Sequence, residues 1–322
     1  MNDKEKGILK AIIYFDIFDF PLTIFEVWKY FYSPSPLEGL RRKNSDDQKI
    51  SLLEIQEILE KSEALKDIID RENGFYFLKG REDIIKKRLE RYNIAGKKFK
   101  RAKKIIKILS LIPFIRLIAV CNTLGYSNAR EESDIDLFLI TAKNRIWTAR
   151  FWSALILKLF GLRPTKITIK DKICLSFFVS EDHLNISDLA LKPEDIYFNY
   201  WLNQLVPIYD ADNIYSGFIE NNEWVLNFLP NSINYQVNWR REVKPGLISR
   251  AIKQLKEKFF YLIPEKIFEK IQLVALPLNL KKLANFDTRV VINSQVLKFH
   301  GNDRRDEFGK IFKEKFLKYE NI

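Results

Sequence analysis

The stretch AVCNTLGYSNAREESDIDLFLIT, residues 119–141, decides the fold that we expect for this chain. Its second half places four acidic residues within positions 131–136, directly before an apolar run, although the whole chain carries a formal net charge of +12. Successive side chains of a strand point to opposite faces, so Asp134 and Asp136 share one face while Ile135 packs behind them. The pattern predicts two carboxylates at one site near the start of a strand.

Paired carboxylate oxygens are typical ligands of hard cations, and Mg²⁺ is usually held by one or two carboxylates together with substrate phosphates. Two such ions can stabilise the attacking and the leaving oxygen of a displacement at phosphorus. We therefore predict that Asp134 and Asp136 are catalytic and bind Mg²⁺, with Mn²⁺ as an alternative. The competing interpretation is a turn capped by Asp134 and a solvated Asp136, because a bare Asp-x-Asp is a common pattern.

Residues 117–141 resemble the polymerase-beta-like nucleotidyltransferase superfamily. Members of that superfamily show a strand, a Gly-Ser pair and then a Ser-Asp-x-Asp that leads into an apolar strand. Here Asn122 and Thr123 stand where Gly-Ser would, and Asp134 follows Asn122 by twelve positions. The resemblance implies transfer of a nucleoside monophosphate from an NTP, expected to be ATP, to an acceptor hydroxyl.

The resemblance also implies which residues contact the nucleotide, namely Asn122, Thr123, Gly125 and Ser133. Thr123 keeps the hydroxyl of the family turn, whereas Asn122 is a departure, although asparagine tolerates a positive φ better than most residues. Gly125 either supplies backbone freedom for the nucleotide or is an ordinary turn glycine. The family site has a third carboxylate that acts as a base or joins a metal. We assign it to Asp171, with an ordinary loop acid as the alternative.

The residues before this core, 1–83, are predicted to form a winged-helix domain. One helix is expected at residues 7–18, a second begins at Thr23, and a third runs from Ser51 to about residue 61. Capping boxes are expected at the start of the second and third helices. A charge-rich loop is expected at 33–48, and Asn73-Gly74 predicts a hairpin turn. FDFPLTIFEVWKYF, GFYFLKGRE and ICLSFFVSED resemble uncharacterised bacterial and archaeal proteins that join a winged-helix unit to a nucleotidyltransferase core.

A long connecting helix is expected at 84–112, because apolar residues recur there every three or four positions. Its other face either meets a nucleic-acid backbone or is simply solvated, and it carries Lys97, Lys98, Lys100, Arg101, Lys103, Lys104 and Lys107. Near the C-terminus, Arg304 and Arg305 either clamp a phosphate or belong to a capped helix start.

The remaining organisation predicts an α+β protein with a small mixed-sheet nucleotidyltransferase core at 113–185 and a helical C-terminal region at 186–322. The core is expected to contain an apolar helix at 145–160, ended by Gly161, and strands at 117–121, 135–141, 166–170 and 173–179. Helices are expected in the C-terminal region at 193–205, 215–228, 247–262 and 265–285.

Composition excludes several other classes. Cys121 and Cys174 lie in apolar runs that favour buried free thiols, so no disulfide framework is expected. His183 and His300 have no neighbouring thiols, which argues against a structural zinc site. The longest apolar stretch, 105–120, is interrupted by charges and falls short of the ~20 residues that span a bilayer. With no signal peptide recognised, we expect a cytoplasmic protein without a membrane partner.

Three functions stay open on the sequence. The leading one is a Mg²⁺-dependent nucleotidyltransferase with an unidentified acceptor, either a nucleic acid or a protein, and the net charge of +12 favours phosphate-bearing partners. The second is a catalytically degenerate, nucleotide-sensing or DNA-binding winged-helix regulator, which Asn122 and the unplaced third acid favour. The third is an antitoxin-like nucleotidyltransferase that modifies a partner protein.

Overall fold

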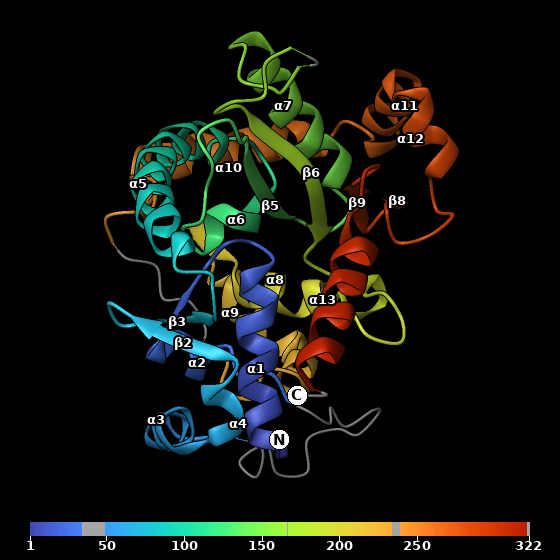
Figure 1. The fold of residues 1–322 in the computed structure, drawn as a ribbon. Helices are drawn as coiled ribbons and strands as arrows, with labels where there is room; N and C mark the ends of the chain where they lie inside the picture. Colours follow the sequence, from blue (N-terminus) through green and yellow to red (C-terminus); the bar gives the residue numbers. More distant parts are fainter. Residues whose placement is uncertain (34–48, 166, 234–238, 321–322) are drawn as a thin grey trace.

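The computed structural model describes residues 1–33, 49–165, 167–233 and 239–320, and it shows an α+β protein with two sheets (Figure 1). A three-stranded sheet has the order β1-β3-β2, and a six-stranded sheet has the order β7-β4-β5-β6-β9-β8. Most of the loop expected at 33–48 lies outside the described residues. Within them, no helix is long and apolar enough to cross a membrane.

The N-terminal region forms the helices and the hairpin that the sequence predicts. Helix α1 (Asp3–Asp16) begins before residue 7 because Asn2 and Glu5 form a capping box. The predicted capping box of Thr23 opens α2 (Ile24–Lys29), and Ser51 caps α3 (Leu52–Lys61), which is followed by α4 (Glu63–Lys66). Strands β2 (Ile69–Glu72) and β3 (Phe75–Leu78) meet at Asn73 and Gly74, both at positive φ, and β1 (Leu22–Thr23) pairs with β3.

Helix α5 (Asp83–Leu109) confirms the predicted long helix, with two corrections to its faces. Leu89 and Tyr92 belong to the apolar repeat on which the helix was predicted, but they are 54% and 60% exposed. Lys98, predicted on the basic face, is 2% exposed. The reason is its set of hydrogen bonds near β5, described below.

The centre of the large sheet is built from β4 (Ile115–Val120), β5 (Ile135–Thr141) and β6 (Ile173–Ser180). Strand β4 is antiparallel to β5, and β5 is parallel to β6, which it reaches through α7 (Ile146–Leu159). Gly161 follows α7 at a φ of 61°, as its predicted capping role requires. The strand predicted at 166–170 is wrong for its described residues, 167–170, which form no strand. The Thr165 hydroxyl accepts from the amides of Ile167 and Thr168 and closes a turn instead.

The C-terminal region is not only helical, because three of its segments complete the large sheet. These strands are β7 (Val206–Asp210), β8 (Val290–Ile292) and β9 (Val296–Phe299), so the sheet extends beyond the boundary predicted at residue 185. The helix predicted at 265–285 is broken at Pro277, which cannot donate a backbone hydrogen bond and restricts Leu276 before it. The helices are the short η2 (Ser187–Leu189), α8 (Ile196–Asn203), α9 (Ile214–Asn221), the short η3 (Glu223–Asn227), α10 (Leu247–Tyr261), α11 (Glu265–Ala275), α12 (Leu278–Leu283) and α13 (Arg305–Glu320).

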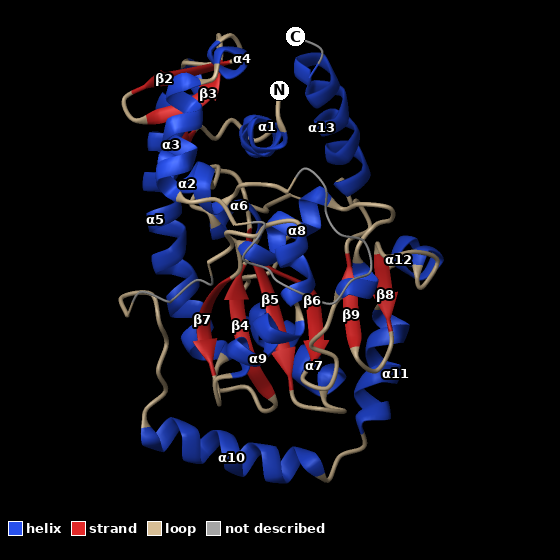
Figure 2. Cartoon of the chain, turned by 90° about the horizontal axis from the view of Figure 1, so that it is seen from below, coloured by secondary structure: helices blue, strands red, loops and turns tan. Residues whose placement is uncertain are grey.

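The large sheet, seen in Figure 2, has a hydrophobic core on each of its faces. On one face, Phe138 and Phe177 pack with α8 and α9, and the same core continues into α1, α2 and the small sheet. On the other face, Leu137 and Leu139 pack with α5, α7 and α11. The N-terminal region therefore shares its core with the sheet that carries the Asp-x-Asp motif.

Candidate functional site

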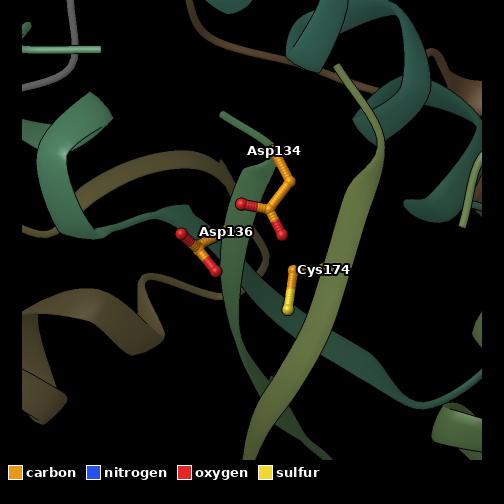
Figure 3. Close-up of side chains that lie close together, drawn as sticks. All are labelled: Asp134, Asp136 and Cys174. Atoms are coloured by element: carbon orange, nitrogen blue, oxygen red, sulfur yellow. The ribbon is translucent and has the colours of Figure 1, made fainter. Parts of the chain in front are cut away.

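Asp134 and Asp136, here called the carboxylate pair, lie at the start of β5 on the side of the sheet where Phe138 packs against Trp201 of α8. Asp136 pairs with Cys174 in the parallel register of β5 and β6. One oxygen of each carboxylate and the Sγ atom of Cys174 all lie within 4.8 Å of one another (Figure 3). Three atoms that can bind a metal therefore meet where β5 and β6 begin.

The carboxylate pair carries negative charge that its neighbours do not balance. Burial, and after it the charge of Asp134, raises the pKa of Asp136 to about 6, although Asn122 and Cys174 donate hydrogen bonds to it. Burial also raises the pKa of Asp134 and of the Cys174 thiol. The charge of Lys98 lowers the pKa of Asp134 less than burial raises it, and the salt bridge of Lys98 is with Asp171. A divalent cation would supply the charge that this site lacks.

The turn after β4 places Asn122 beside the carboxylate pair. Asn122 begins the short helix α6 (Asn122–Gly125) and has a φ of 55°, a conformation that asparagine tolerates and most residues avoid. Its side chain donates a hydrogen bond to Asp136, and its Oδ1 accepts from the hydroxyl of Tyr197 at 3.4 Å. Thr123, the next residue, is half-buried. The predicted neighbours Asn122 and Asp136 are thus brought together.

Gly125 and Ser133 both have partners within the fold. A Cβ atom at position 125 would lie 2.4 Å from the carbonyl oxygen of Gln204, so only glycine allows α6 to pack against the end of α8. This close packing accounts for Gly125 without a nucleotide. The hydroxyl of Ser133 donates to the carbonyl of Arg130 at 2.9 Å and closes the turn before β5.

Asp171, the residue predicted as the third carboxylate, is paired with Lys98. The Nζ atom of Lys98 lies 2.7 Å from Oδ1 of Asp171 and donates to the carbonyls of Ser133 and Glu131 at 2.7 and 3.1 Å. Lys98 therefore ties the turn before β5 to the turn before β6. The cluster that meets the carboxylate pair contains Cys174 and not Asp171.

No known protein family, curated protein or solved structure matches this chain. The superfamily that residues 117–141 resemble therefore stays a prediction. A shared fold would not fix the activity in any case, since unrelated reactions occur on one fold. The function has to be argued from the chemistry of the site.

Sequence reasoning missed Cys174 and Lys98 as members of the site, for two different reasons. The apolar surroundings of Cys174 indicate an ordinary buried thiol. The parallel pairing of β5 with β6 would have placed it opposite Asp136, but pairing partners are not visible in one strand alone. Lys98 belongs to a run of lysines and arginines, and nothing in that run distinguishes the buried member from the exposed ones.

A β-bulge shapes the strand next to Cys174. Between the pairs Asp136–Cys174 and Phe138–Phe177, β6 has one residue more than β5. Such bulges redirect side chains and are frequent next to functional sites. Within the bulge, Ser176 shares a 2.8 Å hydrogen bond with Nε2 of His300. Burial lowers the pKa of His300 to about 3, so this ring is neutral at physiological pH.

Proposed function

We propose that this protein transfers a nucleoside monophosphate from an NTP, with ATP as the expected donor, to an acceptor hydroxyl in a reaction that requires a divalent cation. The observation that carries the proposal is the carboxylate pair, which is half-buried, short of positive charge and mounted on one strand. Asn122 at positive φ lies directly beside it, at the turn where the resembling superfamily holds the nucleotide phosphates. A cation bound at such a site would neutralise negative charge on the phosphoryl group during transfer.

The donor atoms fit a divalent cation. Two carboxylates without a cationic partner suit Mg²⁺ or Mn²⁺, and a bound ion would neutralise charge on the transferred phosphoryl group. Asp134 and Asp136 would hold that ion. Asn122 orients Asp136 through its hydrogen bond, and Lys98 holds the turns before β5 and β6 at their spacing. Cys174 adds a sulfur atom, which softer ions accept more readily than Mg²⁺ does.

One observation favours a second function, a catalytically degenerate nucleotide sensor. Among the described residues, Cys174 and not a third carboxylate completes the cluster around the carboxylate pair, and burial raises the pKa of its thiol. A protonated thiol cannot accept a proton from an acceptor hydroxyl. The carboxylate of Asp171 is held by Lys98 outside the cluster. Binding of MgATP without turnover is the behaviour that this arrangement supports.

Isothermal titration with MgATP tests the site that both functions share. We expect the parent protein to bind and the Asp134→Asn, Asp136→Asn double variant to lose at least tenfold in affinity, about 1.4 kcal/mol. Glu132→Gln is the matched control, because Glu132 is an exposed acid of the same segment outside the cluster. Equal affinity of the parent and the double variant would remove the proposed site. Release of pyrophosphate then separates a transferase from a sensor.

A further inference from the structure

A groove of about 560 Å³ is lined by Cys174, Leu175 and Ser176 of β6. Strand β9 pairs with β6 at Phe177, Phe178 and Val179, so the pairing stops short of Cys174. Helices α7, α11 and α12 lie beside this edge of the sheet (Figure 1). The walls of the groove are largely apolar, and its apolar side chains include Phe151, Leu155, Leu175, Ile271, Leu276 and Phe299.

Arg150 of α7 lines this groove with part of its guanidinium unused. Its Nε atom is buried and has no hydrogen-bond partner among the described residues. Its Nη1 atom donates to Oε1 of Gln272 at 2.6 Å, and the guanidinium lies 4.2 Å from the ring centroid of Phe299. These contacts hold the guanidinium in place and leave its buried Nε–H without an acceptor among the described residues. An unsatisfied buried donor is costly, which makes it an indicator of a ligand.

Arg163 lines the same groove beyond the end of α7. In the part of the chain that the structure describes, neither Arg150 nor Arg163 forms a salt bridge with an acidic residue, although many other arginines do. Burial, together with the charge of Arg163, lowers the pKa of Arg150 to about 10. Two neighbouring half-buried cations thus lack a counter-charge, and an anion would supply it.

We propose that this groove, here called the arginine groove, binds an acceptor substrate that joins an anionic group, a phosphate or a carboxylate, to an apolar body. Arg150 and Arg163 would bind the anion, and the apolar walls would cover the remainder. The identification of the ligand as the acceptor rests on the proposed transfer. Cys174 belongs to the cluster of the carboxylate pair and also lines the arginine groove, so the groove reaches the pair at β6, while Asn122 reaches it from β4 on the other side of β5. In-line transfer needs the acceptor and the leaving group on opposite sides of the phosphorus.

Phenyl phosphate is the simplest probe of the arginine groove, and phenylacetate tests the carboxylate form. Calorimetry should show binding of at least one of them by the parent, while phenol, which lacks the anion, binds at least tenfold more weakly. Arg163→Gln should lower the affinity for the anion by about tenfold or more, because charge-assisted hydrogen bonds are stronger than bonds between neutral groups. Arg250→Gln, on the exposed face of α10, is the matched control. The bound anion should also slow the modification of Cys174 by neutral dithiodipyridine, because Cys174 lines the groove. This protection would show that the anion binds in the arginine groove.

Two results would overturn the inference. The first is that neither anion binds, or that both bind the parent and Arg163→Gln equally. The second is that Arg163→Gln lowers the affinity for MgATP as much as the affinity for phenyl phosphate. That result would mean that the groove binds the nucleotide. Failure of the proposed function looks different, because the Asp134→Asn, Asp136→Asn variant would then bind MgATP as the parent does while phenyl phosphate still requires Arg163. Unchanged melting temperatures of the variants exclude misfolding as the cause.

Discussion

Two groups of buried charges in this protein differ in how completely they are paired. At the start of α13, Arg305 donates to Asp195 at 2.7 Å and to Asp303 at 2.9 Å, and Lys298 lies 3.0 Å from Asp303. Arg305 also reaches the Thr288 hydroxyl at 2.7 Å. Around Cys174, by contrast, the carboxylate pair forms no salt bridge in the described structure, and neither do Arg150 and Arg163 of the groove that Cys174 also lines.

The difference in pairing indicates which of the two groups binds ligands. A buried charge is tolerated when partners and hydrogen bonds satisfy it, and it costs free energy when they do not. The group around Arg305 is satisfied internally, which agrees with the start of a helix rather than a phosphate clamp. The carboxylate pair and the arginine groove lack internal partners, so ligands are the expected source of compensation.

Breaking the paired group should have the largest effect. Arg305→Met leaves Asp195 buried without its cation, so we expect the free energy of unfolding to fall by about 3–5 kcal/mol. Arg304→Met is the control, because Arg304 is 51% exposed in its pair with Glu307 and such surface pairs contribute about 0–1 kcal/mol. Urea denaturation measures both. Equal losses in the two variants would contradict the distinction between paired burial and surface pairing.

Removing a charge from the carboxylate pair should raise the free energy of unfolding, whereas Arg305→Met lowers it. The pKa of Asp136 in the folded protein, about 6, lies above the ordinary value of 3.8. Its stabilising contribution is therefore present below pH 3.8 and is lost as the pH rises through 6. Without divalent cations, Asp136→Asn should raise the free energy of unfolding at pH 7 by about 1–3 kcal/mol, with no gain near pH 3.

Urea denaturation at both pH values, with and without Mn²⁺, tests that prediction. We expect Mn²⁺ to stabilise the parent, and this stabilisation should disappear in Asp136→Asn, since the ion loses a ligand. Glu132→Gln serves again as the control and should change neither quantity. A variant that is less stable than the parent at pH 7 would show that Asp136 is a paired structural residue.

Much of the fold was predictable because local signals decide it. The Thr23 capping box, the Asn73-Gly74 turn and the apolar run of β5 each act within a few residues. Strands β7, β8 and β9 escaped prediction because they are short and gain their stability from pairing with distant segments. Whether the N-terminal region is a winged helix stays a prediction.

The candidate site was predictable only where one strand carries it. Alternation along β5 places Asp134 and Asp136 together without any knowledge of the neighbouring strand. Cys174, Lys98 and Arg150 join the site from β6, α5 and α7 through tertiary packing. No spacing in the sequence encodes those meetings, so the sequence alone does not distinguish Cys174 from Asp171 as the third group.

Introducing a third carboxylate by mutation tests whether the missing acid limits the activity of the site. Cys174→Asp would put an acid opposite Asp136, and an ionised carboxylate there can bind a second ion or accept a proton. We expect release of pyrophosphate from MgATP, with water as acceptor, to rise about tenfold, or about 1.4 kcal/mol in barrier. Cys174→Asn, of similar size but uncharged, is the control. If both variants match the parent, a missing carboxylate is not what limits turnover.

The smallest expected effect separates the backbone role of Asn122 from the role of its side chain. Asn122→Gly and Asn122→Ala both remove the hydrogen bond to Asp136, but only alanine is strained at a φ of 55°. Asn122→Ala should therefore be less stable than Asn122→Gly by about 1 kcal/mol in urea denaturation. In both variants the pKa of Asp136 should rise further, so Mn²⁺ binding, followed by electron paramagnetic resonance, should need a higher pH than in the parent. Equal stability of the two variants would mean that the turn relaxes, and an unchanged pH dependence would mean that Asn122 does not act on the carboxylate pair.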